Sequence, residues 1–149
     1  DLAVVLMGQQ MAEDAGRMRA LIAATEGPVE TLGVRLRAAF SETGGVSDWE
    51  MLRLEMLMLA RRNPAFAEKC QTLYKAQRER VNEGVRLLFA RAGLVPPVEE
   101  EVLTYTIMSL RIGAALLHEA SGPVPLGRIV EMIFRSVASV ARPANSEAA

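Results

Sequence analysis

Apolar residues return every three to four positions along most of this chain, which is the period of a helix that buries one face. Breaks interrupt the pattern at Gly-Pro 27–28, Gly-Gly 44–45, Asn-Pro 63–64, Pro-Pro 96–97 and Ser-Gly-Pro-Val-Pro 121–125. The pattern and its breaks predict six helices, at about 1–24, 28–43, 47–62, 64–93, 102–120 and 126–141. No segment alternates as a strand should. The sequence therefore predicts an all-α six-helix bundle over residues 1–141, followed by a disordered tail at 142–149.

Local signals support several helix ends. Ser47 precedes Glu50 by three residues, the spacing of a capping box in which each side chain bonds the other's backbone amide. Asn63 followed by Pro64 is typical of a cap and first helical position, and the helix that it opens meets no strong breaker before Gly93. This element is predicted to span the domain.

Two predicted helices have unusual faces. The helix at 47–62 has apolar residues around its whole circumference, which predicts a central helix buried on most sides. The segment 102–117 is apolar on almost every side but carries Arg111 near its middle. Its smooth flank favours close helix packing and comprises Val102, Thr106, Ser109, Gly113 and Leu116. Its other flank favours a cavity or a wet seam and combines Ile107, Met108 and Ala115 with a polar stripe of Thr104, Arg111 and His118.

Composition narrows the functional classes. The 149 residues include 17 basic and 18 acidic side chains, so the net charge of −1 provides no general attraction to nucleic acid or anionic membranes. No uncharged run reaches the ~20 apolar residues of a membrane span. The single cysteine, Cys70, excludes an intrachain disulfide, and with no secretory signal pattern a cytoplasmic protein is expected. The chain begins at Asp1, already in a helical pattern, and is expected to be part of a longer protein.

The sequence contains few signals of a catalytic or metal-binding site. The sequence has no Gly-rich phosphate loop, Cys-x-x-Cys pair, Glu-x-x-His motif or nucleophile elbow, so we expect neither an enzyme nor a cofactor. His118 is the only histidine, and a capping or surface role is expected for it rather than metal binding. Cys70 is interpreted as a small core residue, with a redox sensor as the alternative.

The order of these elements resembles the C-terminal regulatory domain of the TetR family of bacterial transcription repressors. Three segments carry the resemblance: Arg-Asn-Pro-Ala-Phe at 62–66, Phe-Ala-Arg-Ala-Gly-Leu-Val at 89–95 and Leu-Arg-Ile-Gly-Ala-Ala-Leu-Leu at 110–117. It implies that residues 1–24 link the domain to an N-terminal helix-turn-helix of roughly 45 to 50 residues that is absent here. The family's DNA-binding residues therefore map onto no position of this chain.

The resemblance also implies partners. Family members pair through their last two long helices, so a homodimer is expected. Its interface is predicted at Ser109, Gly113, Leu116, Val130, Ile133, Phe134 and Val137. A small, mostly apolar effector is expected among the middle helices, where binding changes the spacing of the two DNA-binding heads on the operator. The alternative is a free-standing helical protein–protein interaction module without a small ligand.

The candidate ligand-binding residues combine flexible apolar side chains with a few polar groups. They are Met7, Met11, Trp49, Leu52, Glu55, Met56, Tyr74, Tyr105, Met108 and Arg111. Core filling is the alternative for the methionines, packing for the tyrosines and a plug for Trp49. Our hypothesis is that Glu55 and Arg111 face a shared cavity, either paired with each other or available to a ligand, with a solvent-exposed Glu55 as the alternative.

Overall fold

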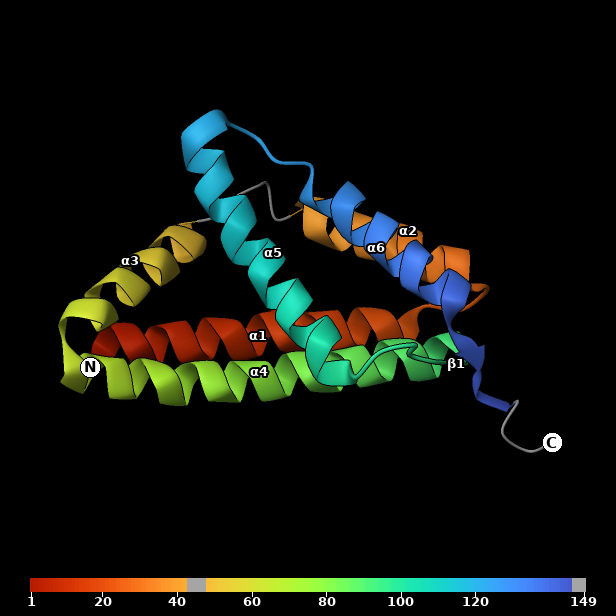
Figure 1. The fold of residues 1–149 in the computed structure, drawn as a ribbon, viewed down its shortest axis with the longest axis horizontal. Helices are drawn as coiled ribbons and strands as arrows, with labels where there is room; N and C mark the ends of the chain where they lie inside the picture. The colour runs from red at the N-terminus through yellow and green to blue at the C-terminus, as the bar shows by residue number, and fades with distance from the viewer. Residues whose placement is uncertain (43–47, 146–149) are drawn as a thin grey trace.

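The computed structural model describes residues 1–42 and 48–145, which contain six helices and two very short strands. Helices α1 (Leu2–Ala24) and α4 (Pro64–Ala92) lie side by side along the length of the molecule (Figure 1). Helices α2 (Val29–Glu42) and α6 (Leu126–Val140) form a second pair, α5 (Glu100–Ser121) crosses between the pairs, and α3 (Asp48–Arg62) lies at one end. The predicted all-α architecture is confirmed.

Helix α4 begins and ends as its sequence predicts. The side chain of Asn63 accepts a hydrogen bond from the Phe66 amide at 3.1 Å, and Pro64 occupies the first turn. The helix ends 29 residues later at Gly93, whose φ of 67° lies in the left-handed region that glycine adopts without strain. The predicted capping box and the predicted Gly-Gly break include residues outside the described part of the chain.

Close approach of α2 and α6 depends on one glycine. Gly127 is buried at the start of α6, and a Cβ there would collide with the backbone carbonyl oxygen of Arg37 on α2. Only a residue without a side chain therefore allows the two backbones to lie this close. The pair then buries Leu32 and Leu36 of α2 against Val130 and Phe134 of α6.

The core comprises three clusters of buried side chains. The first, which we call the methionine cluster, fills the space between α1, α3 and α4 with Met7, Met11, Met56, Phe66, Cys70 and Leu73. The second contains Ile22, Leu32, Leu36, Leu88, Val130 and Phe134, and the third contains Val85, Phe89 and Leu103. The rings of Phe89 and Phe134 meet edge to face, with centroids 6.3 Å apart, and join the second cluster to the third.

Helix α3 is not the central helix that its apolar circumference predicted. Met58 and Leu59 are 54% and 49% exposed, and the buried residues of this helix are Glu50, Arg53 and Met56. Figure 1 shows α3 at the edge of the molecule. A helical wheel shows which positions are apolar, but the number of neighbouring helices that cover them depends on topology.

The disordered tail predicted at 142–149 begins with residues that are ordered in the structure. Residues 142–143 form the strand β2 (Arg142–Pro143), which pairs antiparallel with β1 (Leu94–Val95) directly after α4. The amide of Ala144 also donates to the carbonyl of Gly93 at 2.9 Å. This pairing joins residues far apart in sequence, so the polar composition of the tail carried no sign of it. Residues 146–149 lie outside the described residues.

Candidate functional site

A cavity of about 140 Å³ lies where α1, α4, α5 and the α2 and α6 pair meet. Most of its wall is aliphatic or aromatic. α1 provides Ala15, Met18 and Ile22; α2 provides Leu36 and Phe40; α4 provides Val81, Gly84, Val85, Leu88 and Phe89; α5 provides Leu103, Ile107 and Leu110; α6 provides Val130, Ile133, Phe134 and Val137. Every described helix except α3 therefore contributes side chains to the cavity wall.

The same cavity has a polar side. Asp14, Gln77, Arg80 and Arg111 contribute to its lining, together with Thr106. Gln77 is only 6% exposed, and its Oε1 atom has no hydrogen-bond partner in the described part of the chain. The Nη1 atom of Arg80 is also buried without a partner there. Buried polar groups in proteins are nearly always hydrogen-bonded, so the cavity wall contains two polar atoms whose hydrogen-bonding capacity the described residues do not use.

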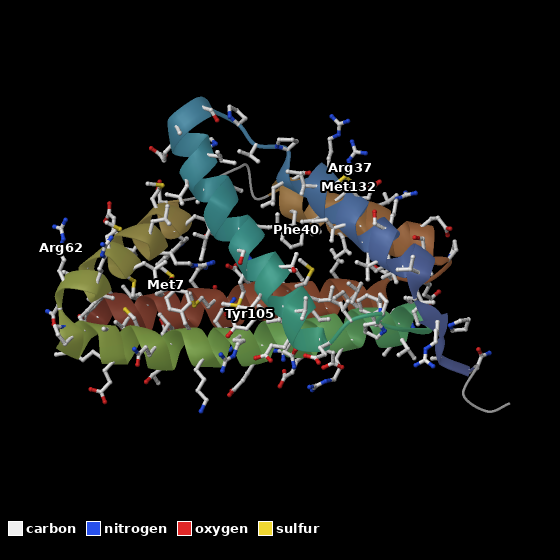
Figure 2. All side chains as sticks on the ribbon, viewed as in Figure 1. Met7, Arg37, Phe40, Arg62, Tyr105 and Met132 are labelled. Atoms are coloured by element: carbon white, nitrogen blue, oxygen red, sulfur yellow. The ribbon has the colours of Figure 1, made fainter. Side chains whose placement is uncertain are left out.

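Arg111 is held at the cavity by a carboxylate of α3. Its Nη2 atom donates to Glu50 Oε1 at 2.8 Å, and Arg53 Nη1 lies 3.2 Å from Glu50 Oε2. Glu50 and Arg53 are 8% and 5% exposed. The Arg111 guanidinium carbon also lies 6.0 Å from the ring centroid of Phe40, which projects from α2 toward α5 (Figure 2). Burial lowers the pKa of Arg53, and the negative charge of Glu50 opposes that shift.

The predicted partnership of Glu55 with Arg111 is wrong. Glu55 is exposed, and Arg111 pairs with Glu50 instead. The two glutamates are five residues apart on α3 and therefore point about 140° apart around the helix. Both carboxylate oxygens of Glu50 contact arginines, and Ser47, its predicted capping-box partner, lies outside the described residues.

Most of the other predicted ligand-binding residues lie in or against the methionine cluster, away from the cavity. They are Met7, Met11, Trp49, Leu52, Met56 and Tyr74. Met7 and Met11 are fully buried and Met56 is 3% exposed; Figure 2 shows Met7 between α1 and α3. The structure thus brings these residues together, as packed core rather than as the lining of this cavity.

Two further groups in the methionine cluster show the effect of burial. Desolvation raises the pKa of Tyr74 to about 12, and its hydroxyl has no hydrogen-bond partner among the described residues. Burial also raises the pKa of the Cys70 thiol. A raised pKa lowers the thiolate fraction at neutral pH, which favours the core interpretation of Cys70 over the redox sensor.

Of the ten predicted ligand-binding residues, Arg111 alone lines the cavity. Tyr105 is 46% exposed on the outer side of α5, where its hydroxyl accepts a hydrogen bond from Arg78 at 2.7 Å, and this bond raises the pKa of Arg78. Met108 is half-buried and does not contribute to the cavity wall.

Gln77 and Arg80 line the cavity but are not among the predicted ligand-binding residues. The available signal was the face of the long helix, where Gln77 lies one turn from Leu73 and interrupts an otherwise apolar stripe.

The polar stripe of α5 joins several helices instead of lining a single cavity. Thr104 is fully buried, and its hydroxyl donates to Asn82 of α4 at 3.0 Å. Arg111 bonds Glu50 of α3, and His118 lies in the last turn with a buried Nδ1 that has no described partner. Among the described residues, no group of three or more His, Cys, Asp or Glu side chains could hold a metal ion.

The smooth flank of α5 borders an open groove of about 660 Å³ between α5 and α6. Val102, Thr106, Ser109 and Gly113 line it, together with Tyr105, Leu110, Ala114, Leu117, Val124, Leu126 and Ile129. Leu116 and Leu117 are each 55% exposed, and Val102 is 50% exposed. Helix α5 therefore exposes several apolar side chains on and beside this groove.

The predicted interface residues of α6 point into the protomer. Val130 and Phe134 are 8% and 5% exposed in the second core cluster, and Ile133 and Val137 line the cavity. Met132, by contrast, is 59% exposed and points outward (Figure 2). Helix α2 covers the apolar stripe of α6. The presence of that stripe in the sequence therefore did not indicate how much apolar surface remains exposed for a partner.

No helix in the described part of the chain is long and apolar enough to cross a membrane. In comparisons with known proteins, the chain matches no protein-family model, no curated protein and no solved structure.

Proposed function

We propose that this chain is the ligand-sensing and dimerising domain of a TetR-like bacterial transcription repressor. The observation that carries the proposal is the largely apolar cavity, because every helix except α3 contributes to it, including the first helix of the chain. In this proposal a small, mostly apolar effector occupies the cavity and changes the position of α1. The DNA-binding heads precede α1 in a cytoplasmic full-length protein.

The two halves of α1 have different neighbours, which supports a role in transmission. Asp14, Ala15, Met18 and Ile22 lie in the cavity wall, whereas Met7 and Met11 pack in the methionine cluster. A ligand that pushes on the second half of this helix therefore acts on a rigid rod whose first half is nearest the proposed DNA-binding head. Binding energy that differs between two positions of α1 is what such a switch requires.

The proposed dimer uses the open groove of α5 and its exposed leucines. Gly113 supports this surface, because a Cβ added there would meet no atom within 4 Å in the protomer. A glycine that the protomer does not need for packing suits the close approach of a second helix from the partner. The proposed interface therefore keeps Ser109, Gly113 and Leu116 from the sequence prediction and adds Val102 and Leu117. It leaves out Val130 and Phe134, which are buried in the protomer.

Ligand sensing is tested by spin-label distances. Gln9 is exposed on the first half of α1, so Gln9→Cys in a Cys70→Ala background provides one label per protomer. One-ring compounds suit the size of the cavity, since a dry apolar cavity of about 150 Å³ accepts benzene. We expect the inter-label distance to change by about 2 Å or more with the tightest binder among benzyl alcohol, benzoate and benzylamine. An unchanged distance at saturation contradicts the proposal.

Dimerisation is tested by light scattering on a matched pair of variants. Gly113→Arg introduces a long side chain at the proposed interface, whereas Gly16→Arg introduces the same side chain on α1, where a Cβ also meets nothing within 4 Å. We expect a dimer for the wild type and Gly16→Arg, and a monomer for Gly113→Arg. A monomeric wild type at micromolar concentration contradicts the proposed interface.

The DNA-binding part of the proposal is tested by the coding sequence upstream of Asp1. About fifty codons that encode a basic helix-turn-helix support it. A start codon directly before Asp1 contradicts it and favours the alternative, a free-standing helical interaction module. The module would share the exposed α5 surface but would bind none of the one-ring compounds.

A further inference from the structure

The cavity combines an apolar wall with an arginine whose counter-ion is absent from the described part of the chain. Asp14 accepts from Gln10 Nε2 at 3.0 Å and pairs with Arg17, so its charge is already compensated. Glu50 pairs with both Arg53 and Arg111. Within the described part of the chain, these contacts leave Arg80 without a carboxylate partner although its Nη1 atom is buried.

Gln77 lies one helical turn before Arg80 and is the second unpartnered group of the same wall. Its side chain makes no hydrogen bond within the described residues, and 94% of the residue is buried, as its 6% exposure shows. Rotation of the terminal amide by 180° exchanges Oε1 for Nε2 at no cost in existing hydrogen bonds. Gln77 and Arg80 therefore offer adjacent N–H donors from a single helix face.

We propose that the cavity binds a small organic carboxylate, with its ring or branched chain against the apolar wall and its carboxylate on Arg80 and Gln77. This inference rests on the proposed ligand-sensing function and specifies the ligand class. A guanidinium and an amide donor together suit a carboxylate, because charge-assisted hydrogen bonds to a planar anion are short and strong. The Arg80 guanidinium, whose Nη1 atom is buried, gains the counter-ion that the described residues do not provide.

Size and charge narrow the class further. A cavity of about 140 Å³ is close to the one that holds benzene, so the ligand has about six to nine non-hydrogen atoms unless the helices separate. A cationic ligand is disfavoured, because Arg80 and Arg111 both line the cavity and Asp14 is already paired. A neutral ligand of the same shape gains the apolar contacts but leaves Arg80 uncompensated.

The test compares benzoate, benzyl alcohol and benzylamine by calorimetric titration of the 149-residue chain. We expect benzoate to bind about tenfold or more tightly than benzyl alcohol, and benzylamine to bind weakest. Arg80→Met should abolish the preference for benzoate while retaining benzyl alcohol binding. The matched control is Arg78→Met, which removes the same charge from the same helix outside the cavity.

A Gln77→Leu variant keeps the inference testable if Arg80→Met fails to fold. It replaces the amide by an apolar group of similar size. The variant should bind benzoate more weakly and toluene more tightly than the wild type does. Equal affinity of benzoate and benzyl alcohol in the wild type, or an unchanged preference in Arg80→Met, overturns the carboxylate inference and leaves ligand sensing intact. Benzoate binding without any change in the α1 label distance supports the inference and contradicts the proposed sensing function. If none of the three compounds binds, both are overturned.

Discussion

The methionine cluster and the cavity are both built on α1 and α4, yet one is filled and the other is hollow. Near the start of these helices, Met7, Met11 and Phe66 pack against α3. Farther along the same two helices, α2, α5 and α6 provide the facing walls, and a cavity of about 140 Å³ remains. The difference lies in the neighbours, because one helix closes over the first region whereas three helices meet at angles over the second.

This comparison shows what flexible side chains indicate. Methionine adapts its shape to irregular gaps, and in this protein Met7, Met11 and Met56 are packed in the core. The cavity wall contains only one methionine, Met18, and consists mainly of branched and aromatic side chains that cannot extend into the space. The methionines in the sequence therefore indicated the position of the packed cluster. The position of the cavity depends on how the helices cross, which residue types do not indicate.

The largest expected effect is at the boundary between the two regions. Glu50→Ala leaves Arg53 and Arg111 without their carboxylate, and removal of one partner from a buried ion pair costs about 3 kcal/mol or more. Urea unfolding measures the loss. Glu55→Ala, an exposed change on the same helix, should stay within about 0.5 kcal/mol. If Glu50→Ala and Glu55→Ala lowered the free energy of unfolding equally, the Glu50 ion pairs would not stabilise the contact between the two regions.

An effect of at most the same size distinguishes filled from hollow packing directly. Met11 is fully buried, and Met11→Ala should lower the free energy of unfolding by about 3 kcal/mol, since it creates a new cavity in a packed cluster. Ile107→Ala enlarges a space that already exists and should cost about half as much. Denaturant titration of both variants tests this, and a larger loss for Ile107→Ala would reverse the distinction.

Alkaline pH provides a test of the desolvation in the methionine cluster. The pKa of Tyr74 is raised to about 12 in the folded state, so folding favours its protonated form. Stability is therefore unaffected below pH 10 and falls as the pH rises from 10 to 12. Two pKa units correspond to about 2.7 kcal/mol, and the loss should be smaller than this because solvent reaches part of the Tyr74 side chain. Tyr74→Phe should reduce the alkaline fall in stability measured by urea unfolding. Tyr105→Phe, at an exposed position, should leave the fall unchanged.

The smallest effect concerns the glycine in the cavity wall. Gly84 lines the cavity, and a Cβ there meets no atom within 4 Å. Gly84→Ala and Gly16→Ala should each stabilise their helix by about 0.5 to 1 kcal/mol, which thermal unfolding measures. Gly84→Leu should also fill the cavity and reduce benzoate binding, whereas Gly16→Leu should not. A cavity that still binds benzoate in Gly84→Leu lies elsewhere in the protein.

Part of the site was predictable from local sequence. Arg111 was identified because a single charge in an apolar helix is expensive to bury and requires a partner or a ligand. Its partner was misassigned, because Glu50 and Glu55 have similar surroundings along the chain and differ only in which side of α3 faces α5. Gln77 interrupts the apolar face of α4, but the sequence did not show that another helix covers this position.

The sequence by itself determined the six helices of the described chain and the two ends of α4, because these depend on hydrogen bonds and side chains within a few residues. Asn63, Pro64 and Gly93 bound α4 for this reason. Only the tertiary structure decided which apolar faces meet. It placed α3 at the edge, turned Phe134 inward, paired 142–143 with 94–95 and left a cavity beside Arg80. These outcomes depend on how helices cross and on contacts between distant residues, which no local periodicity encodes.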